Sequence, residues 1–339
     1  IMVDCGTQIT LCDFPVRVDM YRGCSHGCKY CFVSRKYDIK NIGINKKCTL
    51  KTVENFIKGH RSQVTNWCDW KIPLHWGGVS DPFQPLEKKH RLSLKLLELF
   101  AETQYPFIVS TKGELIADEP YITLLGKCNA VVQISMVCDK LDSIERGAPR
   151  FNKRLAIIEK IAPKVKRLNV RCQPYFVHLH EEIKNNLPTY AKLGVHGVIF
   201  EGYKSITKMS GMERLGADYV YSKKILKGKF TELKELSHEN GLKFYSGENR
   251  LRTMGDSLGC CGADGLQGFE GNKYNINHYL YDRNNFIPTK SMLNVGTARC
   301  FKAFTQDSFA VAPLRRKSYK EFMDICIKDR SMLRPFLGV

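Results

Sequence analysis

The chain has 339 residues, enough for one large α/β barrel with an extension or for two separate domains. Hydrophobic residues make up 43% and charged residues 26%, which is typical of a folded globular protein, and no apolar run reaches the roughly 20 residues that a membrane helix needs. The 53 Lys and Arg residues exceed the 34 Asp and Glu residues, and the net charge of +19 favours a polyanionic partner, although a basic surface that only aids solubility has the same signature.

The 14 cysteines bear on the expected compartment. The first residues, "IMVDCGTQITLCDF", lack the basic region and the apolar core of a signal peptide. We therefore expect a cytoplasmic protein whose thiols are reduced and available to bind metal.

Short apolar runs alternate with longer helical patterns along the first 205 residues. This alternation predicts βα units with parallel strands, so the fold class is α/β, and six units suggest a partial, TIM-like (β/α)6 barrel with its chemistry on the loops after the strands. We expect this core to cover 1–205, and 206–339 to form an α+β extension that binds or covers the substrate. The predicted strands are 15–21, 72–80, 106–112, 130–137, 167–176 and 196–202, the predicted helices are 87–103, 152–165 and 181–194, and the extension adds a helix at 229–241 and a strand at 242–247.

Three cysteines follow the first predicted strand in the stretch "YRGCSHGCKYC": Cys24, Cys28 and Cys31. Three thiolates leave one iron of a four-iron cluster without a protein ligand, and an open coordination position is what a catalytic metal site needs. The alternative is a structural zinc site completed by His26 or by a distant cysteine.

The spacing CxxxCxxC, with an aromatic Tyr30 before the last cysteine, resembles the signature of the radical S-adenosylmethionine (SAM) superfamily. The segments 77–98, 109–113 and 145–158 resemble its spore photoproduct lyase-like branch, and the similarity covers roughly 14–205. It implies a partial barrel of the radical SAM type and a [4Fe-4S] cluster whose open iron binds SAM. It also implies cleavage of SAM to a 5′-deoxyadenosyl radical, with an electron from an external reductant such as flavodoxin or ferredoxin.

The resemblance also implies which residues bind SAM. Ser80 and Lys112 would contact it, the lysine pairing with its carboxylate, while Ser135 would contact the ribose or the carboxylate and Tyr30 would pack on the adenine side. Each of these four residues also has an alternative without SAM: Ser80 could cap a turn and Lys112 could lie on the surface. Ser135 could be an ordinary strand residue and Tyr30 an ordinary core aromatic.

Two positions depart from the lyase pattern. The lyase has a cysteine hydrogen donor two residues before the serine, where this chain has Gly78, and a tyrosine after the third cluster cysteine, where this chain has Phe32. We therefore do not predict a thymine-dimer lyase. Cys138 and Cys172 are candidate replacement donors, although a buried cysteine is also a common small hydrophobic residue.

The glycine-rich stretch 247–268 is the second unusual segment. Its Cys260 and Cys261 could bind a second metal with Cys300, or the stretch could be a lid or a closing loop with buried thiols. On the loop after strand 167–176, His178 and His180 beside Glu181 could bind metal, act as acid and base or contact substrate, with an ordinary polar loop as the alternative. The lid reading makes substrate contacts of Glu248, Asn249, Arg250, Arg252 and Asp256.

These features together predict a radical SAM enzyme of the lyase or isomerase type that modifies or rearranges a nucleobase, with DNA favoured as substrate. Basic and aromatic residues interleave in 273–286 and 312–322, as in proteins that grip splayed nucleotides. One alternative is a radical SAM isomerase or modifying enzyme for a peptide or small molecule. The other is not an enzyme but a basic nucleic-acid-binding protein with a structural metal.

Overall fold

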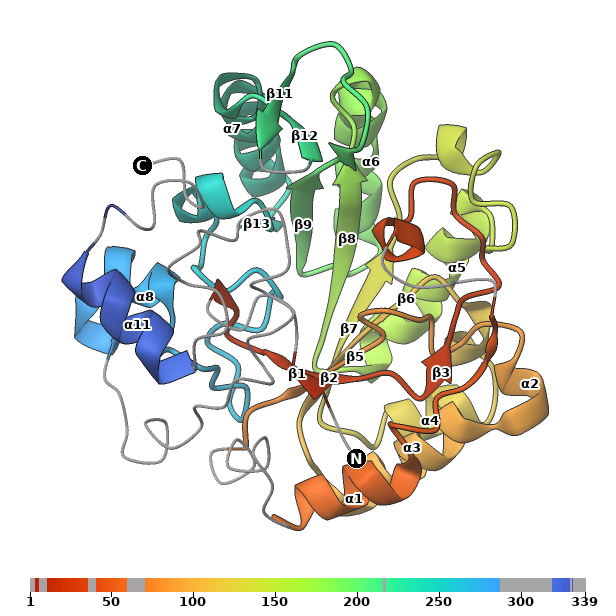
Figure 1. The fold of residues 1–339 in the computed structure, drawn as a ribbon. Helices are drawn as coiled ribbons and strands as arrows, with labels where there is room; N and C mark the ends of the chain where they lie inside the picture. The colour runs from red at the N-terminus through yellow and green to blue at the C-terminus, as the bar shows by residue number, and fades with distance from the viewer. Residues whose placement is uncertain are drawn as a thin grey trace.

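The computed structural model describes residues 4–5, 11–35, 41–59, 71–215, 218–286, 319–329 and 331. Its centre is an eight-stranded sheet that curves into a partial barrel with helices on its outer face (Figure 1). The first strand is antiparallel to the second, and the other seven strands are parallel. In sheet order the strands are β1 (Asp4–Cys5), β2 (Val16–Val18), β5 (Leu74–Trp76), β6 (Phe107–Thr111), β7 (Ala130–Ser135), β8 (Arg167–Tyr175), β9 (Gly197–Gly202) and β13 (Lys243–Ser246).

Helices follow most of the parallel strands. They are α1 (Leu50–Ile57), α2 (Glu87–His90), α3 (Leu92–Thr103), α4 (Tyr121–Leu125), α5 (Phe151–Ile161), α6 (His180–Lys192), α7 (Lys223–Glu239), α8 (Ile276–Tyr281) and α11 (Tyr319–Lys328). Smaller sheets join β3 (Tyr21–Arg22) to β4 (Gly43–Ile44), and β10 (Lys204–Ser205) to β12 (Asp218–Tyr221) and β11 (Met212–Leu215). In the described part of the chain, no helix combines the length and the apolar character needed to cross a membrane.

The predicted partial α/β barrel is confirmed, with each of the six predicted strands present and in the expected order. The strand predicted at 242–247 is β13, and it pairs in parallel with β9, so the sheet gains a seventh parallel strand from beyond residue 205. The helix predicted at 87–103 is wrong as one element because the chain breaks at Arg91, which has a φ of 51°. The buried carboxylate of Glu87 turns back to accept hydrogen bonds from the backbone N–H groups of Ser93 (2.9 Å) and Leu94 (3.0 Å), and so caps a second helix.

The strands alternate between an apolar face toward the helices and a polar face toward the barrel interior. Leu74 and Trp76 of β5 belong to the main core, where Trp76 packs against Phe100 of α3 and Phe107 of β6. His75, between Leu74 and Trp76 in the strand, faces the barrel interior. A strand covered by helices on one face alone has this period of two.

The glycine-rich segment enters the barrel interior. Cys261 packs with Ile108 of β6 and Val131 of β7 in a second, smaller core, which also contains Phe14, Ala263 and Phe269. The inward-facing amides of Gln133 and Asn169 donate hydrogen bonds to the carbonyl oxygens of Cys261 (2.9 Å) and Gly262 (3.1 Å) respectively. Because Ile108 and Val131 are the second residues of their strands, this small core forms a floor beneath the strand ends that carry the candidate site.

Candidate active site

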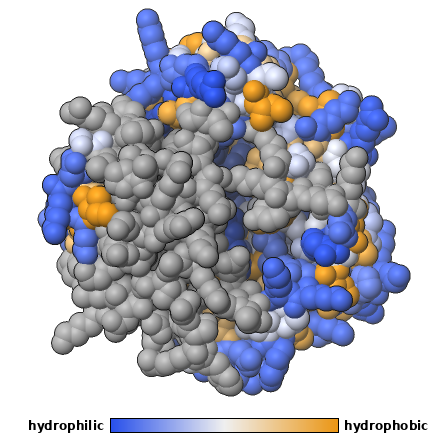
Figure 2. All heavy atoms as spheres, viewed as in Figure 1, coloured by the Kyte–Doolittle hydropathy of each residue, from blue (hydrophilic) through white to orange (hydrophobic). Residues whose placement is uncertain are grey.

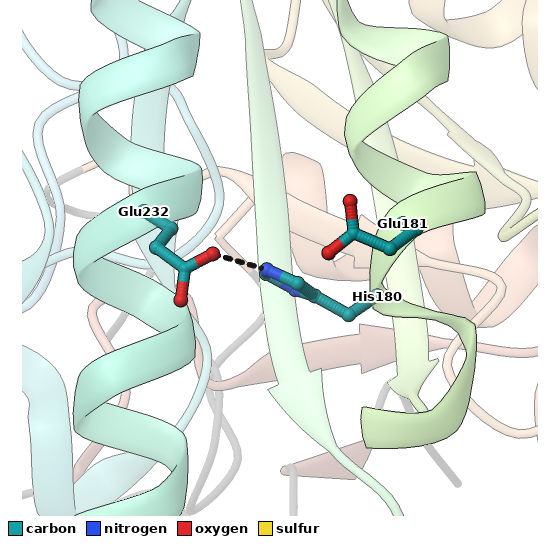
Figure 3. Close-up of side chains that lie close together, drawn as sticks. All are labelled: His180, Glu181 and Glu232. Atoms are coloured by element: carbon teal, nitrogen blue, oxygen red, sulfur yellow. Dashed lines mark hydrogen bonds and ion pairs between the residues drawn. The ribbon is translucent and has the colours of Figure 1, made fainter.

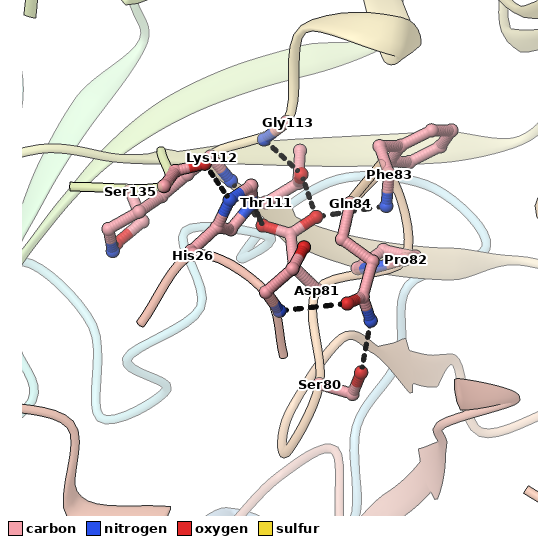
Figure 4. Close-up of polar contacts among 12 residues, drawn as sticks. His26, Ser80, Asp81, Pro82, Phe83, Gln84, Thr111, Lys112, Gly113 and Ser135 are labelled. Atoms are coloured by element: carbon pink, nitrogen blue, oxygen red, sulfur yellow. Dashed lines mark hydrogen bonds and ion pairs between the residues drawn. The ribbon is translucent and has the colours of Figure 1, made fainter. Parts of the chain in front are cut away.

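The three predicted cluster cysteines lie on the loop after β3, and all three thiols are free and partly exposed. Two buried residues from the loop after β5 fix this segment (Figure 4). The hydroxyl of Ser80 donates to the carbonyl of Gly23 (2.6 Å), and Gln84 accepts from the backbone N–H of Ser25 (3.0 Å) while donating to Gly23 (3.1 Å). The structure therefore places Ser80 as a support of the cysteine loop.

His26, between the first two cysteines, is bound on both ring nitrogens. Its Nδ1 lies 2.9 Å from the carbonyl oxygen of Gly147 and its Nε2 lies 3.1 Å from a carboxylate oxygen of Asp81. Asp81 also accepts from the Thr111 hydroxyl (2.7 Å) and the backbone N–H of Lys112 (2.7 Å), and Figure 4 shows the carboxylate at the centre of these contacts. The cysteine loop is thus clamped to the ends of β5 and β6.

Charge reinforces this clamp. Burial alone would raise the pKa of Asp81, but the His26 charge and the hydrogen bonds from His26, Lys112 and Thr111 lower it to about 2. Burial alone would lower the pKa of His26, but Asp81 and the Gly147 carbonyl outweigh burial and raise it. With both nitrogens engaged, His26 does not serve as the fourth ligand of a zinc ion.

In the part of the chain that the structure describes, the sulfur atoms of the three cysteines are not close enough together to bind one metal ion. Only His180, Glu181 and Glu232 bring three metal-binding atoms within 4.8 Å of one another in the described ranges. The thiolates that hold a multi-iron cluster bind different iron atoms and lie further apart than the ligands of a single zinc.

Three of the four residues predicted to contact SAM gather around one buried carboxylate, that of Glu145. The Lys112 ammonium donates to the hydroxyl of Ser135 (2.8 Å), lies 3.7 Å from Glu145, and sits 5.8 Å from the centroid of the Tyr30 ring. Glu145 also accepts from the Tyr30 hydroxyl and pairs with the fully buried Arg154. Burial lowers the pKa of Lys112, and the nearby Cys28 opposes that effect. The result is a partly open lysine beside the cysteine loop.

Sequence reasoning missed the residues that build this arrangement. On sequence grounds His26 is considered only as a zinc ligand, and Asp81, Glu145 and Arg154 are covered only within segments that resemble the family. The sequence does not mark these four residues, because their loops contain several other charged side chains; only the structure shows that they are buried and paired.

The two candidate hydrogen donors lie in the core. Cys172 alternates along β8 with inward-facing Arg171 and Gln173, so its thiol points to the helix side, near Tyr190 of α6. Cys138 follows β7 and is also buried, and burial raises the pKa of both thiols. Neither thiol is among the groups around Lys112.

His180 and its neighbours lie in the outer helix layer. His180 Nε2 lies 2.9 Å from Glu232 of α7 and Nδ1 lies 2.9 Å from the Tyr175 hydroxyl, while Glu181 lies beside the ring (Figure 3). The ammonium groups of Lys184 and Lys229 lie 3.7 and 3.3 Å from Glu232. Since lysines balance the carboxylates, the group functions as an ion-pair network between α6 and α7. His178 instead packs against the ring of Phe176.

The five predicted substrate contacts of the C-terminal part mostly bind one another or the nearby backbone. Arg250 pairs with Glu248 (3.1 Å), and Arg252 donates to Asn249 (2.6 Å) and to the carbonyl of Ser246 (2.7 Å). These bonds hold the 3-10 helix η8 (Asn249–Met254) against the end of β13, and Asp256 accepts from the backbone N–H of Phe244 (3.0 Å) in the same strand. Cys260 and Cys261 lie on the interior segment, and Cys300 lies outside the described residues.

Solved structures of known proteins share this architecture. Spore photoproduct lyase complexed with dinucleoside spore photoproduct superposes with a TM-score of 0.52 at 15% identity, over 68% of this chain and 76% of that chain. SuiB from Streptococcus suis, bound to S-adenosylmethionine, superposes with a TM-score of 0.50 at 13% identity, over 71% of this chain and 52% of that chain. The chain has the fold of the radical SAM enzymes. At these identities the likeness extends to the radical SAM fold and no further.

Sequence comparison adds relatives without a described activity. The uncharacterized proteins Rv2578c of Mycobacterium tuberculosis (strain ATCC 25618 / H37Rv) and Mb2609c of Mycobacterium bovis are each 26% identical over 201 residues, which is 56% of this chain. The match spans 58% of the length of these relatives. No protein-family model matches the chain.

Proposed function

We propose that this protein is a radical SAM enzyme that modifies or rearranges a nucleobase, with DNA as the favoured polymer. The observation that carries the proposal is the placement of Cys24, Cys28 and Cys31 on a clamped loop beside Lys112, on a radical SAM fold. In this proposal the three thiolates would hold a [4Fe-4S] cluster and leave one iron without a protein ligand for SAM. The chemistry that the bound cluster and SAM would supply is a 5′-deoxyadenosyl radical for hydrogen abstraction.

The residues around the cysteine loop have distinct parts in this proposal. Lys112 keeps N–H donors available beyond its bond to Ser135 and would pair with the SAM carboxylate. Ser135 and Tyr30 would border the nucleoside part of SAM. Ser80 and the His26–Asp81 pair would orient the cluster loop from behind, so that the cysteines keep their spacing when the cluster is reduced. The reductant would be an external one-electron donor such as flavodoxin or ferredoxin, in a cytoplasmic setting.

The departure from the lyase pattern has a structural counterpart. Gly78 lies against the side chain of Arg17, and a Cβ at this position would be 2.8 Å from Arg17 Cδ and closer still to Nη1. A cysteine at this position would therefore require Arg17 to move, and Phe32 offers no hydroxyl. This supports a modification or rearrangement instead of the splitting of a photodimer. Residues 206–339 would contribute the substrate-binding part.

The choice of a nucleic acid as the substrate is supported by the net charge of +19 and by the likeness to a lyase whose structure was solved with a dinucleoside. A flipped or single-stranded base would enter the barrel, while the phosphates remain at its mouth. A peptide or small molecule is the other candidate substrate class, and the same experiment separates them.

The test is anaerobic. The protein is reconstituted with iron and sulfide, reduced and given SAM, and 5′-deoxyadenosine is measured with and without single-stranded DNA. We expect about four iron atoms per chain, deoxyadenosine that increases with DNA, and loss of both in the variant with alanine at Cys24, Cys28 and Cys31. Deoxyadenosine that does not respond to DNA would move the substrate to a peptide or small molecule. Bound zinc with intact SAM would refute the proposal that the protein is a radical SAM enzyme.

A further inference from the structure

The cysteine loop is part of a strongly basic hairpin. It joins β3 to β4, which pair antiparallel, and we call residues 21–48 the basic hairpin. This segment of the sequence contains seven Lys and Arg residues, one Asp and no Glu. Its exposed charged side chains in the described ranges are Arg22, Lys29, Lys46 and Lys47, and none of these four has a carboxylate oxygen within 4.0 Å there. The positive charge of the hairpin is therefore not balanced by carboxylates among the described residues.

The same hairpin exposes large apolar side chains. Phe32, Ile42 and Ile44 are 51%, 40% and 41% exposed, and they are three of the five large hydrophobic side chains that are exposed in the described part of the chain. Figure 2 shows small hydrophobic areas among hydrophilic residues on the side of the molecule that carries β3 in Figure 1. Exposed apolar groups with a charged surround are typical of a surface that binds another protein.

The cysteine loop has an inner and an outer side. His26 and Tyr30 are held toward the barrel by the contacts described above, so they belong to the site around Lys112. Lys29 and Phe32 are exposed instead, although each directly follows a predicted cluster cysteine in the chain. The inner side is thus used for the candidate active site, and the outer side is open to a partner.

Backbone contacts connect the outer side to the cysteines. The backbone N–H and the hydroxyl of Ser34 both donate to the carbonyl of Cys31 (3.2 and 2.6 Å). The backbone N–H of Lys29 donates to the carbonyl of Ile144 (3.0 Å) in the loop after β7. That loop adds the exposed Arg146, which also lacks a carboxylate within 4.0 Å among the residues that the structure describes. The outer surface therefore continues from the hairpin onto this loop with the same sign of charge.

The proposed function requires an electron from outside the molecule, and electron transfer weakens steeply with distance, so a carrier has to come close to the cysteines. We propose that the outer side of the basic hairpin is the docking surface for an acidic one-electron carrier protein, which gives up one electron as the cluster gains one. Unbalanced lysines steer an acidic partner toward this surface. Phe32, Ile42 and Ile44 supply apolar area for a small, transient interface. The inference rests on the proposed function and names the surface that receives the reductant.

A nucleic acid is the other partner that a basic surface could bind. Its phosphates pair with lysine and arginine but gain nothing from aliphatic side chains. Ile42 and Ile44 offer area that a protein partner would bury, and this favours the carrier protein. The two partners are separated by the same set of variants.

The test measures the binding of an acidic flavodoxin to the reconstituted protein by calorimetry, at about 0.05 M and about 1 M salt. In Lys46→Glu/Lys47→Glu we expect unchanged iron content and an affinity that falls about tenfold at low salt and little at high salt. Ile42→Ser should weaken binding about threefold at both salt concentrations, because salt does not screen an apolar contact. The matched control Lys160→Glu/Lys164→Glu changes the net charge equally at exposed positions near the start of β8 and should bind like the unaltered protein.

A second measurement compares flavodoxin with dithionite as the source of electrons for 5′-deoxyadenosine. Lys46→Glu/Lys47→Glu should slow the reaction with flavodoxin and leave the reaction with dithionite unchanged, because a small reductant needs no docking surface.

The outcomes separate the two proposals. An unchanged flavodoxin affinity in Lys46→Glu/Lys47→Glu would refute the docking surface. Weaker binding of single-stranded DNA by this variant, with unchanged flavodoxin binding, would refute it too and assign the hairpin to nucleic acid. If the unaltered protein forms no deoxyadenosine with dithionite, the proposed function fails, while the binding measurements still decide whether the hairpin docks an acidic protein.

Discussion

Replacing Asp81 with Asn isolates the charge that clamps the cysteine loop. The change keeps the size of the side chain and removes the charge that lies 3.1 Å from His26 Nε2. Folding lowers the Asp81 pKa from 3.8 to about 2, and at 1.36 kcal/mol per pKa unit this corresponds to about 2 kcal/mol of stability. Asp81 is only 8% exposed, so little of this energy is lost to solvent screening. We expect Asp81→Asn to lower the free energy of unfolding by about 2 kcal/mol at pH 6.

The pH dependence gives this prediction its sign. Because the Asp81 pKa is lower in the folded state, its contribution is present above its unfolded pKa of 3.8 and is lost as the pH falls toward about 2. The His26 pKa is raised, so its contribution is present below its unfolded pKa of 6.5 and is lost as the pH rises through the folded value. The difference between the variant and the unaltered protein should therefore be largest between about pH 4 and 6.5.

The assay is urea unfolding of the metal-free protein at pH 6, 4 and 3, followed by circular dichroism. Asp139→Asn, at an exposed carboxylate after β7, is the matched control and should change the free energy of unfolding by less than about 0.5 kcal/mol at each pH. A loss in Asp81→Asn that is the same size at pH 6 and pH 3 would show that charge does not hold the loop.

Three further predictions follow from contacts of the same region. Lys112→Met should retain iron but lose at least tenfold in SAM affinity, measured by equilibrium dialysis; unchanged affinity would remove Lys112 from the SAM site. Gly78→Cys should displace Arg17 and lower the free energy of unfolding by about 1–3 kcal/mol, measured by urea unfolding; an unchanged free energy of unfolding would contradict the contact between Gly78 and Arg17. Gly147→Ala should reduce the iron bound after reconstitution, because a Cβ there lies 2.9 Å from His26 Cα and closer to the Ser25 carbonyl. Gly228→Ala, on α7 with nothing within 4 Å, should bind iron normally and be stabilised by about 0.5–1 kcal/mol; equal iron loss in both would refute the steric account.

The sequence predicts those parts of the fold that depend on local pattern. The six strands and the helices predicted at 152–165 and 181–194 follow from the alternation of apolar runs with periods of two and 3.6 residues, whereas α1 and α4 were not predicted. The position of the cysteine loop after the first parallel strand follows from strand order and cysteine spacing alone. The break at Arg91 is less accessible, because a buried Glu87 overrides a helical pattern that otherwise continues.

The contacts of the candidate site depend on pairs that are far apart in sequence. His26 meets Asp81 and Gly147 across separations of 55 and 121 residues, and no local rule selects these partners. The face to which Cys172 points depends on the register of β8, which a one-residue shift would reverse. The role of Gly78 becomes visible only when the Arg17 side chain lies across it.

The hydrogen bond between Gln133 and the backbone of Cys261 lets the glycine-rich segment set the hydrogen-bond directions of side chains that it does not contact. An amide side chain can rotate to exchange its donor and its acceptor, and here a single carbonyl oxygen from the glycine-rich segment decides between the two orientations. The Gln133 oxygen accepts from the Ser110 hydroxyl (2.7 Å), and Ser110 in turn lies 3.1 Å from His75 Nε2. If the Cys261 carbonyl moved and the amide reversed, the Ser110 hydroxyl would turn toward His75, and the pattern of donors and acceptors inside the barrel would change with every side chain in place. Relatives of this protein could in this way differ inside the barrel by altering only the backbone path around Cys261.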